Sequence, residues 1–444
     1  MSRRIEFVKN EIIDQYLNDE NEQRPWIIGF SGGKDSTAML QMVWYALREI
    51  PKERRLREIY VICNDTLVEN PIISSYVNGV LEKIRDAALK QGLPIFAQTT
   101  TPKLEDSFWV NLIGRGYPTP NSLFRWCTER LKIEPTTNFI LNKLGEKGEA
   151  IILLGTRHDE SVTRSKSIQK HDIKGKRLTK HQLPNVFVYS PIKELIVEEV
   201  WGYINTVASP WFANNKELYT IYADASSDDY ECPTVIVNKN SPSCGQSRFG
   251  CWVCTVVKQD KSMTALIENG YEWLRPLLEY RNNLYENRNL PQNREKKRKN
   301  GDDSIGPYTA EYRQELLQDL LKVQVEIQKN HSDIQLISNQ ELIAIQIIWH
   351  RENIFNVTVA HIFGLISETF NADMKSKESQ LAQEKKLLTS AFQSDVPKVE
   401  LVEQLLMLNK SKQLLQKKRG LPAEIENHLE RFIHQQNTQH NLIC

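Results

Sequence analysis

A glycine-rich segment with mixed charge, SGGKDS at residues 31–36, has the residue types of a phosphate-binding loop. It follows the apolar run Trp26–Phe30 and leads directly into a helical pattern that begins at Thr37. The adjacent Gly32 and Gly33 allow a tight turn that brings backbone N–H groups close to an anion. The N-terminus of the following helix adds N–H donors and a partial positive charge. The segment is therefore a candidate anion site.

The charged and hydroxyl side chains of this loop match a pyrophosphate group with its metal ion. Lys34 supplies a mobile cation, and Asp35 supplies a carboxylate that can hold Mg²⁺. Ser31 and Ser36 add hydroxyl donors. The spacing differs from the G-x-x-x-x-G-K-[ST] loop, so transfer of a terminal phosphoryl group is not the expected reaction. The alternative is a glycine turn with a serine helix cap that binds nothing.

Seven cysteines are too few to form a disulfide scaffold in a chain of 444 residues, and four of them crowd together. Zinc and iron–sulfur clusters both accept four thiolates. Structural zinc sites usually use two short cysteine pairs, and only one pair is short here, so the spacing favours a [4Fe–4S] cluster. Four unrelated buried thiols are the alternative. The spacing is C-x11-C-x6-C-x2-C, formed by Cys232, Cys244, Cys251 and Cys254.

The order of apolar runs and helical patterns predicts the scaffold that positions these groups. Helical stretches at Thr37–Ile50, Ile73–Lys90 and Cys127–Leu144 separate the candidate strands. Strands that alternate with helices form parallel sheets, so we expect an α/β fold with a doubly wound, mostly parallel sheet. Ligands bind at the carboxyl ends of such strands. The candidate strands are Trp26–Phe30, Ile59–Cys63, Pro94–Gln98, Ala150–Gly155 and Val186–Tyr189.

The length allows two or three domains. Residues 1–220 carry the α/β pattern, residues 221–305 the cysteine-rich segment with a basic stretch, and residues 306–444 a helical pattern. Lys and Arg number 57 and Asp and Glu 56, which excludes a uniformly basic nucleic-acid-binding protein. No apolar run approaches the ~20 residues of a membrane-spanning helix, and the N-terminus lacks the apolar region of a signal peptide. We therefore expect a cytoplasmic protein with no membrane partner.

Two basic stretches are candidate contacts for a nucleic-acid backbone. Ser165–Asn185 carries six Lys or Arg against one acid, and its lack of periodicity predicts a loop. Arg281–Lys299 carries seven Lys or Arg against two Glu. Charge runs are usually solvated surface, and this is the alternative for both stretches.

Three motifs in order resemble those of a known superfamily. SGGKDS resembles the PP-loop of the ATP pyrophosphatases, which have a HUP-like fold and cleave ATP to AMP and pyrophosphate while adenylating a substrate. Arg125-Trp126-Cys127-Thr128 with Leu131-Lys132 is similar to the R-x-C-T-x-x-L-K segment of phosphoadenosine-phosphosulfate (PAPS) reductase-like proteins. The segment Gly155–Ser161, followed by Arg164, resembles their G-x-R-x-x-E-S-x-x-R segment. The resemblance implies catalytic roles for Lys34 and Asp35.

The PP-loop and the cysteine spacing together resemble the DndC-type sulfurtransferases of bacterial DNA phosphorothioation. Pro276–Asn282, Gly306–Thr309 and Arg313 also look like that family, so the resemblance runs from about residue 24 to about residue 325. It implies an enzyme that uses ATP, Mg²⁺ and a [4Fe–4S] cluster to adenylate a DNA phosphate and insert sulfur. The implied partners are DNA, other subunits of a modification complex, and a cysteine desulfurase that donates sulfur. The motifs do not separate the double-stranded from the single-stranded systems.

The resemblance also gives roles to single residues. Cys127 is the candidate thiol that carries sulfur, and the alternative is a packed core cysteine. Arg157 and Arg164 are expected to pair with phosphates, Arg157 as a catalytic residue, whereas isolated arginines are more often surface charges. Asp65 ends the second strand, where it can meet ribose or Mg²⁺ or can simply form a turn.

Three other functions compete with this hypothesis. A PAPS or adenosine-phosphosulfate reductase is disfavoured by the intact PP-loop and by the lack of adjacent cysteines in the sequence. An RNA-thiolating PP-loop enzyme uses such similar chemistry that only the substrate separates it from a DNA-modifying one. A non-enzymatic iron–sulfur scaffold of a DNA-binding complex would release no pyrophosphate.

Overall fold

The computed structural model describes residues 3–21, 23–160, 162–171, 176–224, 250–297 and 305–352, together with residues 354, 358, 359, 361, 362, 401, 402 and 405. In α6, the side chains of residues 162–164, 167 and 171 are outside this description. None of the helices among these residues is long and apolar enough to cross a membrane.

Six strands form one sheet in the order β3-β2-β1-β4-β6-β5. All neighbouring pairs are parallel except β5 and β6. Every residue of β1 and β4 is buried, as expected for central strands covered on both faces. The predicted doubly wound, mostly parallel α/β fold is confirmed. The strands are β1 (Trp26–Gly29), β2 (Ile59–Asn64), β3 (Ile95–Thr100), β4 (Ala150–Leu153), β5 (Leu178–Lys180) and β6 (Val186–Tyr189).

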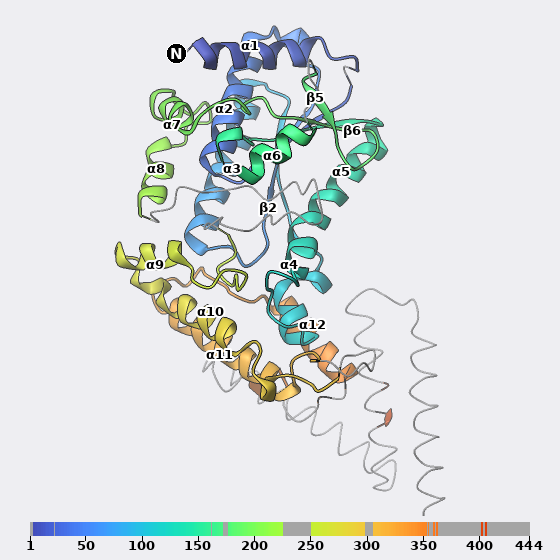
Figure 1. Cartoon of the computed structure of the whole chain (residues 1–444), viewed down its shortest axis with the longest axis vertical. Coiled ribbons are helices and arrows are strands. Elements are labelled where there is room, and N and C mark those ends of the chain that lie inside the picture. Colours follow the sequence, from blue (N-terminus) through green and yellow to red (C-terminus); the bar gives the residue numbers. More distant parts are fainter. Residues whose placement is uncertain are drawn as a thin grey trace, which may run out of the picture.

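Helices cover both faces of the sheet (Figure 1). Alternate residues of each strand point to opposite faces, so each face presents its own set of apolar side chains to the helices. Ile28 belongs to the large core shared with α1, α2, α3 and α7, whereas Ile27 belongs to a smaller core shared with α5. The predicted helical stretches are confirmed at α2, α3 and α5. The helices of this part are α1 (Arg3–Leu17), α2 (Lys34–Glu49), α3 (Pro71–Gln91), α4 (Trp126–Thr128), α5 (Glu134–Lys147), α6 (Val162–His171), α7 (Val197–Thr206) and α8 (Asn215–Asp224).

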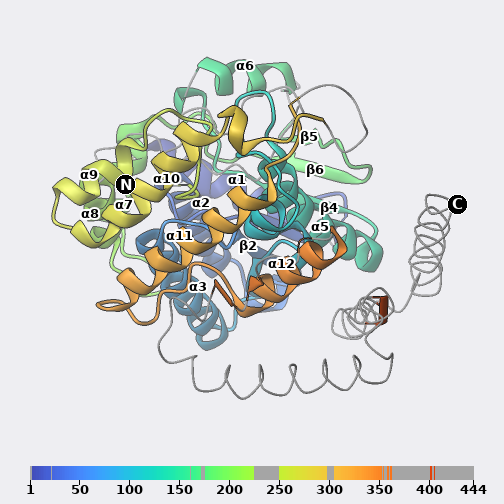
Figure 2. The same cartoon turned by 90° about the horizontal axis from the view of Figure 1, so that it is seen from below.

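A second group of helices lies beyond the carboxyl ends of the strands (Figures 1 and 2). It consists of α9 (Lys261–Glu268), α10 (Arg275–Asn287), α11 (Ala310–Gln328) and α12 (Asn339–Arg351). The chain that leaves β2 bonds to this group, because the Trp252 N–H donates to the Val68 carbonyl at 2.9 Å. Short helical turns complete the fold: η1 (Lys52–Arg54), η2 (Leu104–Asp106), η3 (Val110–Gly114), η4 (Glu129–Ile133), η5 (His158–Glu160), η6 (Glu272–Leu274) and η7 (Pro291–Asn293).

The prediction that Ser165–Asn185 forms a loop is wrong in part. Residues up to His171 belong to α6, and β5 adds an antiparallel edge strand by pairing with β6. Arg177, just before β5, pairs with Glu11 at 3.3 Å and with Asp14, both on α1. These partners are distant in sequence, so local periodicity could not reveal the strand. The helical pattern predicted for residues 306–444 is confirmed up to residue 352, where it forms α11 and α12. Its later part at residues 402–418, VEQLLMLNKSKQLLQKK, lies almost wholly outside the described residues.

Arg313 of α11 joins the helical group to the α/β part. Its buried guanidinium donates to the carbonyls of Ile113 and Gly114 at 3.0 and 2.8 Å and pairs with Glu352 at 2.7 Å. Trp349 of α12 adds a bond of 2.9 Å to the same Ile113 carbonyl. The motif residue Arg313 is therefore part of the scaffold.

We expect Arg313→Ala to lower the free energy of unfolding by about 3 kcal/mol, because it leaves buried carbonyls and a carboxylate unpaired. The matched control is Arg275→Ala, which removes only an exposed pair with Glu272 and should cost less than about 1 kcal/mol. Urea unfolding of the full chain measures both. Equal losses for the two variants would contradict a joining role for Arg313.

Candidate functional site

The strand order reverses beside β1, at the position where open α/β sheets form a ligand crevice. The connection after β1 leads to β2 on one side, whereas β4 lies on the other side, so the sheet order reverses between β1 and β4. Open α/β sheets bind ligands outside such a reversal. The loop 31–36 follows β1 and the segment Gly155–Arg157 follows β4, so two of the three predicted motifs flank the crevice.

Glycine is required at two positions where these loops pack tightly. A Cβ atom on Gly155 would lie 3.0 Å from the backbone C of Asp35 and N of Ser36. A Cβ atom on Gly32, whose φ is +75°, would lie 2.5 Å from Cγ2 of Val77. The strand end and the helix start are thus in backbone contact, which a larger residue would break.

The hydroxyl groups predicted as phosphate donors also hold the loop together. Ser31 Oγ accepts from the Gly33 N–H at 3.3 Å and lies 3.1 Å from Ser36 Oγ. Ser36 Oγ bonds to the Gly33 carbonyl at 3.1 Å. These bonds fix the turn at the N-terminus of α2, where backbone N–H groups face an anion site.

Asp35 and Arg157 form a buried ion pair across the crevice, with Nε and Oδ1 2.6 Å apart. The side chains are only 8% and 2% exposed, respectively. Burial opposes the charge on Arg157, but Asp35 outweighs it, so the pKa of Arg157 is raised. Arg157 also pairs with Asp159 at 3.3 Å. Asp35 is therefore the anchor of Arg157.

The predicted Mg²⁺ contact at Asp35 does not fit this arrangement. Arg157 occupies Oδ1, and the Lys34 ammonium lies 3.6 Å from Oδ2. A carboxylate that is already paired with two cations is a poor ligand for a third. Lys34 and Asp35 are also buried, with residue exposures of only 3% and 6%.

Tyr222 is a site residue that the sequence did not reveal. It lies on α8, and its hydroxyl accepts the backbone N–H of Lys34 at 3.2 Å. Its ring centroid lies 5.3 Å from the Lys34 ammonium. The two residues are 188 positions apart in the sequence, which explains why no motif connects them.

Asp65 forms a turn at the end of β2. Its Oδ1 accepts the Leu67 N–H at 2.8 Å, and Leu67 has the unusual φ of +63°. This bond matches the turn alternative for Asp65. The turn directs Thr66 and Glu69 toward the helical group, and neither residue was singled out in the sequence.

Cys251 lies in a polar pocket at this turn. Its Sγ is 3.3 Å from the Thr66 hydroxyl and 4.0 Å from a carboxylate oxygen of Glu69. Burial raises the pKa of Cys251 well above its usual value, Glu69 and Cys127 raise it further, and Lys132 opposes the shift. Burial likewise raises the pKa of Glu69. The second predicted motif lies beside this turn, because Asn64 at the end of β2 donates to the carbonyl of Lys132, a residue of that motif, at 3.1 Å.

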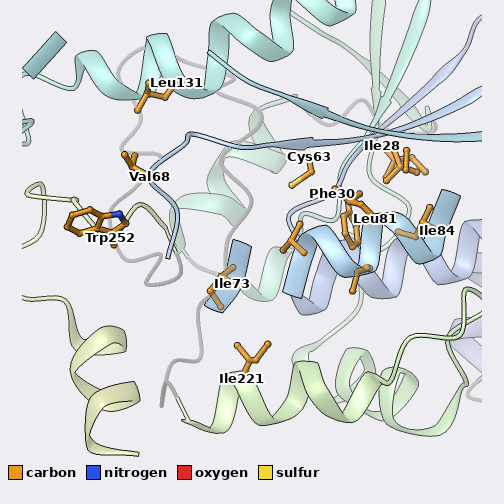
Figure 3. Packing of buried hydrophobic residues seen from close by; sticks show 14 of the residues in the cluster. Ile28, Phe30, Cys63, Val68, Ile73, Leu81, Ile84, Leu131, Ile221 and Trp252 are labelled. Carbon is orange, nitrogen blue, oxygen red and sulfur yellow. The ribbon is translucent and has the colours of Figure 1, made fainter. Parts of the chain in front are cut away.

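The segment around Cys254 is held by arginines of the second basic stretch. The fully buried Arg281 donates to the carbonyls of Cys254 and Lys258, each at 2.8 Å, and to that of Val257. Arg288 donates to the Thr255 carbonyl at 2.9 Å. Figure 3 shows Trp252, on the same segment, beside Val68 at the end of β2.

These contacts count against the prediction that the arginines of Arg281–Lys299 bind DNA. Arg281, Arg288 and Arg294 donate to main-chain carbonyls of the protein itself, Arg294 to that of Gly306 at 2.8 Å. Lys296 and Lys297 of this stretch are exposed. Several cations of the first basic stretch are exposed as well. They are Lys166, Lys170, Lys176 and Lys180.

The described thiols fit an iron–sulfur ligand set. The Cys254 N–H donates to the Cys251 carbonyl at 3.0 Å, which turns the C-x-x-C pair back on itself. A buried thiol with a raised pKa is inert until a metal takes its proton, and the Thr66 hydroxyl beside Cys251 donates to Glu69 at 2.9 Å. Cys232 and Cys244 lie outside the described residues, as does the side chain of Arg164. Within the described ranges, no three His, Cys, Asp or Glu side chains form a metal site.

A cavity of about 100 Å³ opens between the sheet and α5. Its walls are mostly apolar, with Thr136, Thr137 and His181 among the few polar side chains, and Gly29 of β1 lines it two residues before the phosphate loop. Burial lowers the pKa of His181, so its ring is neutral at physiological pH. Mostly apolar walls with a few polar groups are the usual lining of small-molecule sites.

Comparison with known families matches residues 25–257, more than half of the chain, to the phosphoadenosine phosphosulfate reductase domain. The chain belongs to this family. The match includes the phosphate loop, the Gly155–Arg157 segment and all four clustered cysteines. These three groups therefore all lie within the PAPS reductase domain.

Individual relatives of this PAPS reductase-domain protein are distant. An uncharacterized protein of Methanocaldococcus jannaschii is 26% identical over 167 residues, which are 38% of this chain and 28% of the relative. The chain thus spans less than a third of that relative's length.

Solved structures with a similar arrangement come from three kinds of protein. The PAPS reductase of Candida auris, in complex with phosphate, is 14% identical over 50% of this chain and 92% of its own, with a TM-score of 0.29. The U34-tRNA thiolase NcsA of Methanococcus maripaludis, with its [4Fe–4S] cluster, is 13% identical over 65% and 82%, with a TM-score of 0.30. The FMN adenylyltransferase of Candida glabrata is 15% identical over 45% and 55%, with a TM-score of 0.27. At these values none of the three carries a functional conclusion.

Asp35→Ala should lower the free energy of unfolding by about 3–5 kcal/mol, because it leaves the Arg157 guanidinium buried without its carboxylate. Adding Arg157→Met to this variant should restore part of that loss, since no unpaired charge then remains. Thermal or urea unfolding of the single and double variants measures the coupling. Strictly additive losses would show that the two side chains do not act as a pair.

Proposed function

We propose that this protein is an ATP-dependent sulfurtransferase that adenylates a DNA backbone phosphate and supports replacement of a non-bridging oxygen by sulfur. The observation that carries the proposal is that the Cys127 motif and Cys251 both lie at the carboxyl end of β2: Asn64, the last residue of β2, donates to the Lys132 carbonyl at 3.1 Å, and Cys251 Sγ lies 3.3 Å from the Thr66 hydroxyl. Sulfur chemistry and a phosphate loop thereby share one edge of the sheet. The protein is proposed to act in the cytoplasm with DNA, other modification subunits and a cysteine desulfurase.

The first chemical step is activation of the DNA phosphate. An oxygen bound to phosphorus leaves poorly, whereas AMP leaves well, so a phosphate oxygen attacks the α-phosphorus of ATP and pyrophosphate departs. The backbone N–H groups at the start of α2 and the Lys34 ammonium stabilise the charge that develops on pyrophosphate. The Asp35–Arg157 pair holds this loop against β4, and the cavity beside Gly29 receives the adenine.

The second step is attack of a sulfur nucleophile on the activated phosphorus, with AMP leaving. Cys127 is the proposed carrier of that sulfur, as a persulfide formed by the desulfurase: its outer sulfur forms the bond to phosphorus as AMP leaves. An external thiol then attacks the Cys127 sulfur, so the S–S bond breaks, the phosphorothioate departs and a disulfide forms on Cys127, which a second external thiol reduces. Cys127 is only partly buried and lies on the short α4, so a partner can reach it. Burial holds Cys251 in the thiol form, which makes it the poorer nucleophile of the two in the absence of metal.

Cys251 and Cys254, together with Cys232 and Cys244, are proposed to hold a [4Fe–4S] cluster. When bound, such a cluster supplies electron transfer or a site for sulfur, and it requires deprotonated thiolates. The Thr66 hydroxyl lies 3.3 Å from Cys251 Sγ and donates to Glu69 at 2.9 Å, and Arg281 fixes the carbonyls around Cys254. These residues prepare the ligand loop.

The proposed DNA contact is the first basic stretch. Lys166 and Lys170 lie on α6, which begins a few residues after the Gly155–Arg157 segment. Lys176 precedes β5, and Lys180 is its last residue. Exposed lysines on an element next to the crevice can neutralise a phosphate backbone without reading sequence.

Phosphorothioate in genomic DNA tests the function. Cells that lack the gene are complemented with the wild type, Lys34→Ala or Cys127→Ser, and digested DNA is searched by mass spectrometry for phosphorothioate dinucleotides. We expect the modification with the wild type only, whereas purified Cys127→Ser should still convert ATP to AMP and Lys34→Ala should not. Lys322→Ala, on an exposed part of α11, is the control that should behave as wild type. Unmodified DNA in wild-type cells, with thiolated RNA instead, would overturn the DNA proposal.

Iron content tests the cluster. Anaerobically purified protein should be brown and hold about four irons per chain. Cys251→Ser or Cys254→Ser should lose most of the iron and the colour, whereas Cys63→Ser, a buried thiol of β2, is the matched control that should keep them. Stoichiometric zinc in the anaerobic protein would contradict the assignment.

A further inference from the structure

Tyr222 contacts both ends of the phosphate-loop lysine. Its hydroxyl oxygen accepts the Lys34 backbone N–H at 3.2 Å, and its ring centroid lies 5.3 Å from Nζ of the same residue. An ammonium within about 6 Å of an aromatic centroid is attracted by the ring, most strongly where water is excluded. Tyr222 and Lys34 are only 7% and 3% exposed, so this contact is shielded from water.

Both contacted groups of Lys34 belong to the anion site. Its N–H is among the first donors of α2, which have no acceptor within the helix and face an incoming anion. Its ammonium lies between the Tyr222 ring and Asp35, whose Oδ2 is 3.6 Å away. A long, flexible lysine side chain is thereby kept beside the loop.

The helix that carries Tyr222 is fixed to the helix that carries Lys34. Asn215, the first residue of α8, accepts from Gln41 of α2 at 3.0 Å and donates to the Ile204 carbonyl at 2.8 Å. The Tyr222 ring packs edge-on against Trp201 of α7 at 5.1 Å. The ring therefore has little freedom to move away from the lysine.

The phenol remains neutral in this position. Burial, and then the nearby Asp35, raise the pKa of Tyr222 well above its usual value. A neutral hydroxyl can accept the Lys34 N–H in the empty loop without competing, as a phenolate would, with an anionic ligand.

We propose that Tyr222 is a positioning residue for Lys34. Its ring holds the Lys34 ammonium over the phosphate loop, and its hydroxyl oxygen accepts the Lys34 backbone N–H until a phosphate oxygen replaces it as the acceptor. The proposal rests on the proposed function only in that the loop binds the pyrophosphate part of ATP. It makes α8 a component of the ATP site. The phosphate-loop motif does not include this helix.

Inorganic pyrophosphate is the probe for the test, measured by calorimetry on the full chain. Tyr222→Leu should weaken pyrophosphate binding by on the order of tenfold, because the ammonium loses its aromatic support. In a Lys34→Ala background the same substitution should change the affinity less than about twofold, since the residue through which it acts is absent. Equal losses in both backgrounds would overturn the proposal and leave Tyr222 a merely structural residue.

Two further variants separate the ring from the hydroxyl. Tyr222→Phe keeps the ring and should bind pyrophosphate within about threefold of the wild type, and a tenfold loss in this variant would overturn the role of the ring. Tyr222→Met replaces Tyr222→Leu if the branched side chain prevents folding, because methionine fills irregular gaps. Tyr219→Phe, on an exposed part of the same helix, is the matched control that should bind as wild type.

The failure of this inference is distinguishable from failure of the proposed function. Wild-type protein that binds pyrophosphate, together with unchanged binding by Tyr222→Leu, would reject the positioning role and leave the ATP site standing. Wild-type protein that binds neither pyrophosphate nor a non-hydrolysable ATP analogue would reject the ATP site itself, and with it both proposals.

Discussion

The buried ion pair of Asp35 and Arg157 is the constraint on which the site depends. It joins the loop after β1 to the segment after β4 at the point where the strand order reverses. Gly155 allows the two backbones to touch, and a buried pair tolerates the loss of neither partner. The phosphate loop therefore has its shape before any ligand binds, which is what catalysis by fixed donors requires.

The same edge of the sheet also receives the cysteine-rich segment, and a second group of contacts fixes it there. The turn made by Asp65 presents Thr66 to Cys251, and Arg281 binds the carbonyls that follow Cys251. The helical group is thus part of the site as well as of the scaffold. Arg281 ties the cysteine loop to α10, and the bond between Trp252 and Val68 ties it to the chain that follows β2.

Charge is distributed so that the cations of the site are held and those of the surface remain available. Lys34, Arg157 and Arg281 are buried among carboxylates, carbonyls and an aromatic ring. The lysines of the first basic stretch stay exposed near the crevice. A nearly neutral chain can in this way present a local positive surface to a polyanion.

The sequence alone determined the α/β class, the central strands and the position of the phosphate loop, because apolar periodicity and glycine spacing are local properties. It could not assign Asp35 to Arg157, place Tyr222 on the Lys34 amide, or turn Arg281 inward, since these contacts join residues 122, 188 and about 25 positions apart. It also missed β5, whose pairing with β6 and α1 stabilises a segment without periodicity. A motif names the residue types that chemistry needs. Only the packing of the folded chain decides which charged side chains pair within the protein and which remain for a ligand.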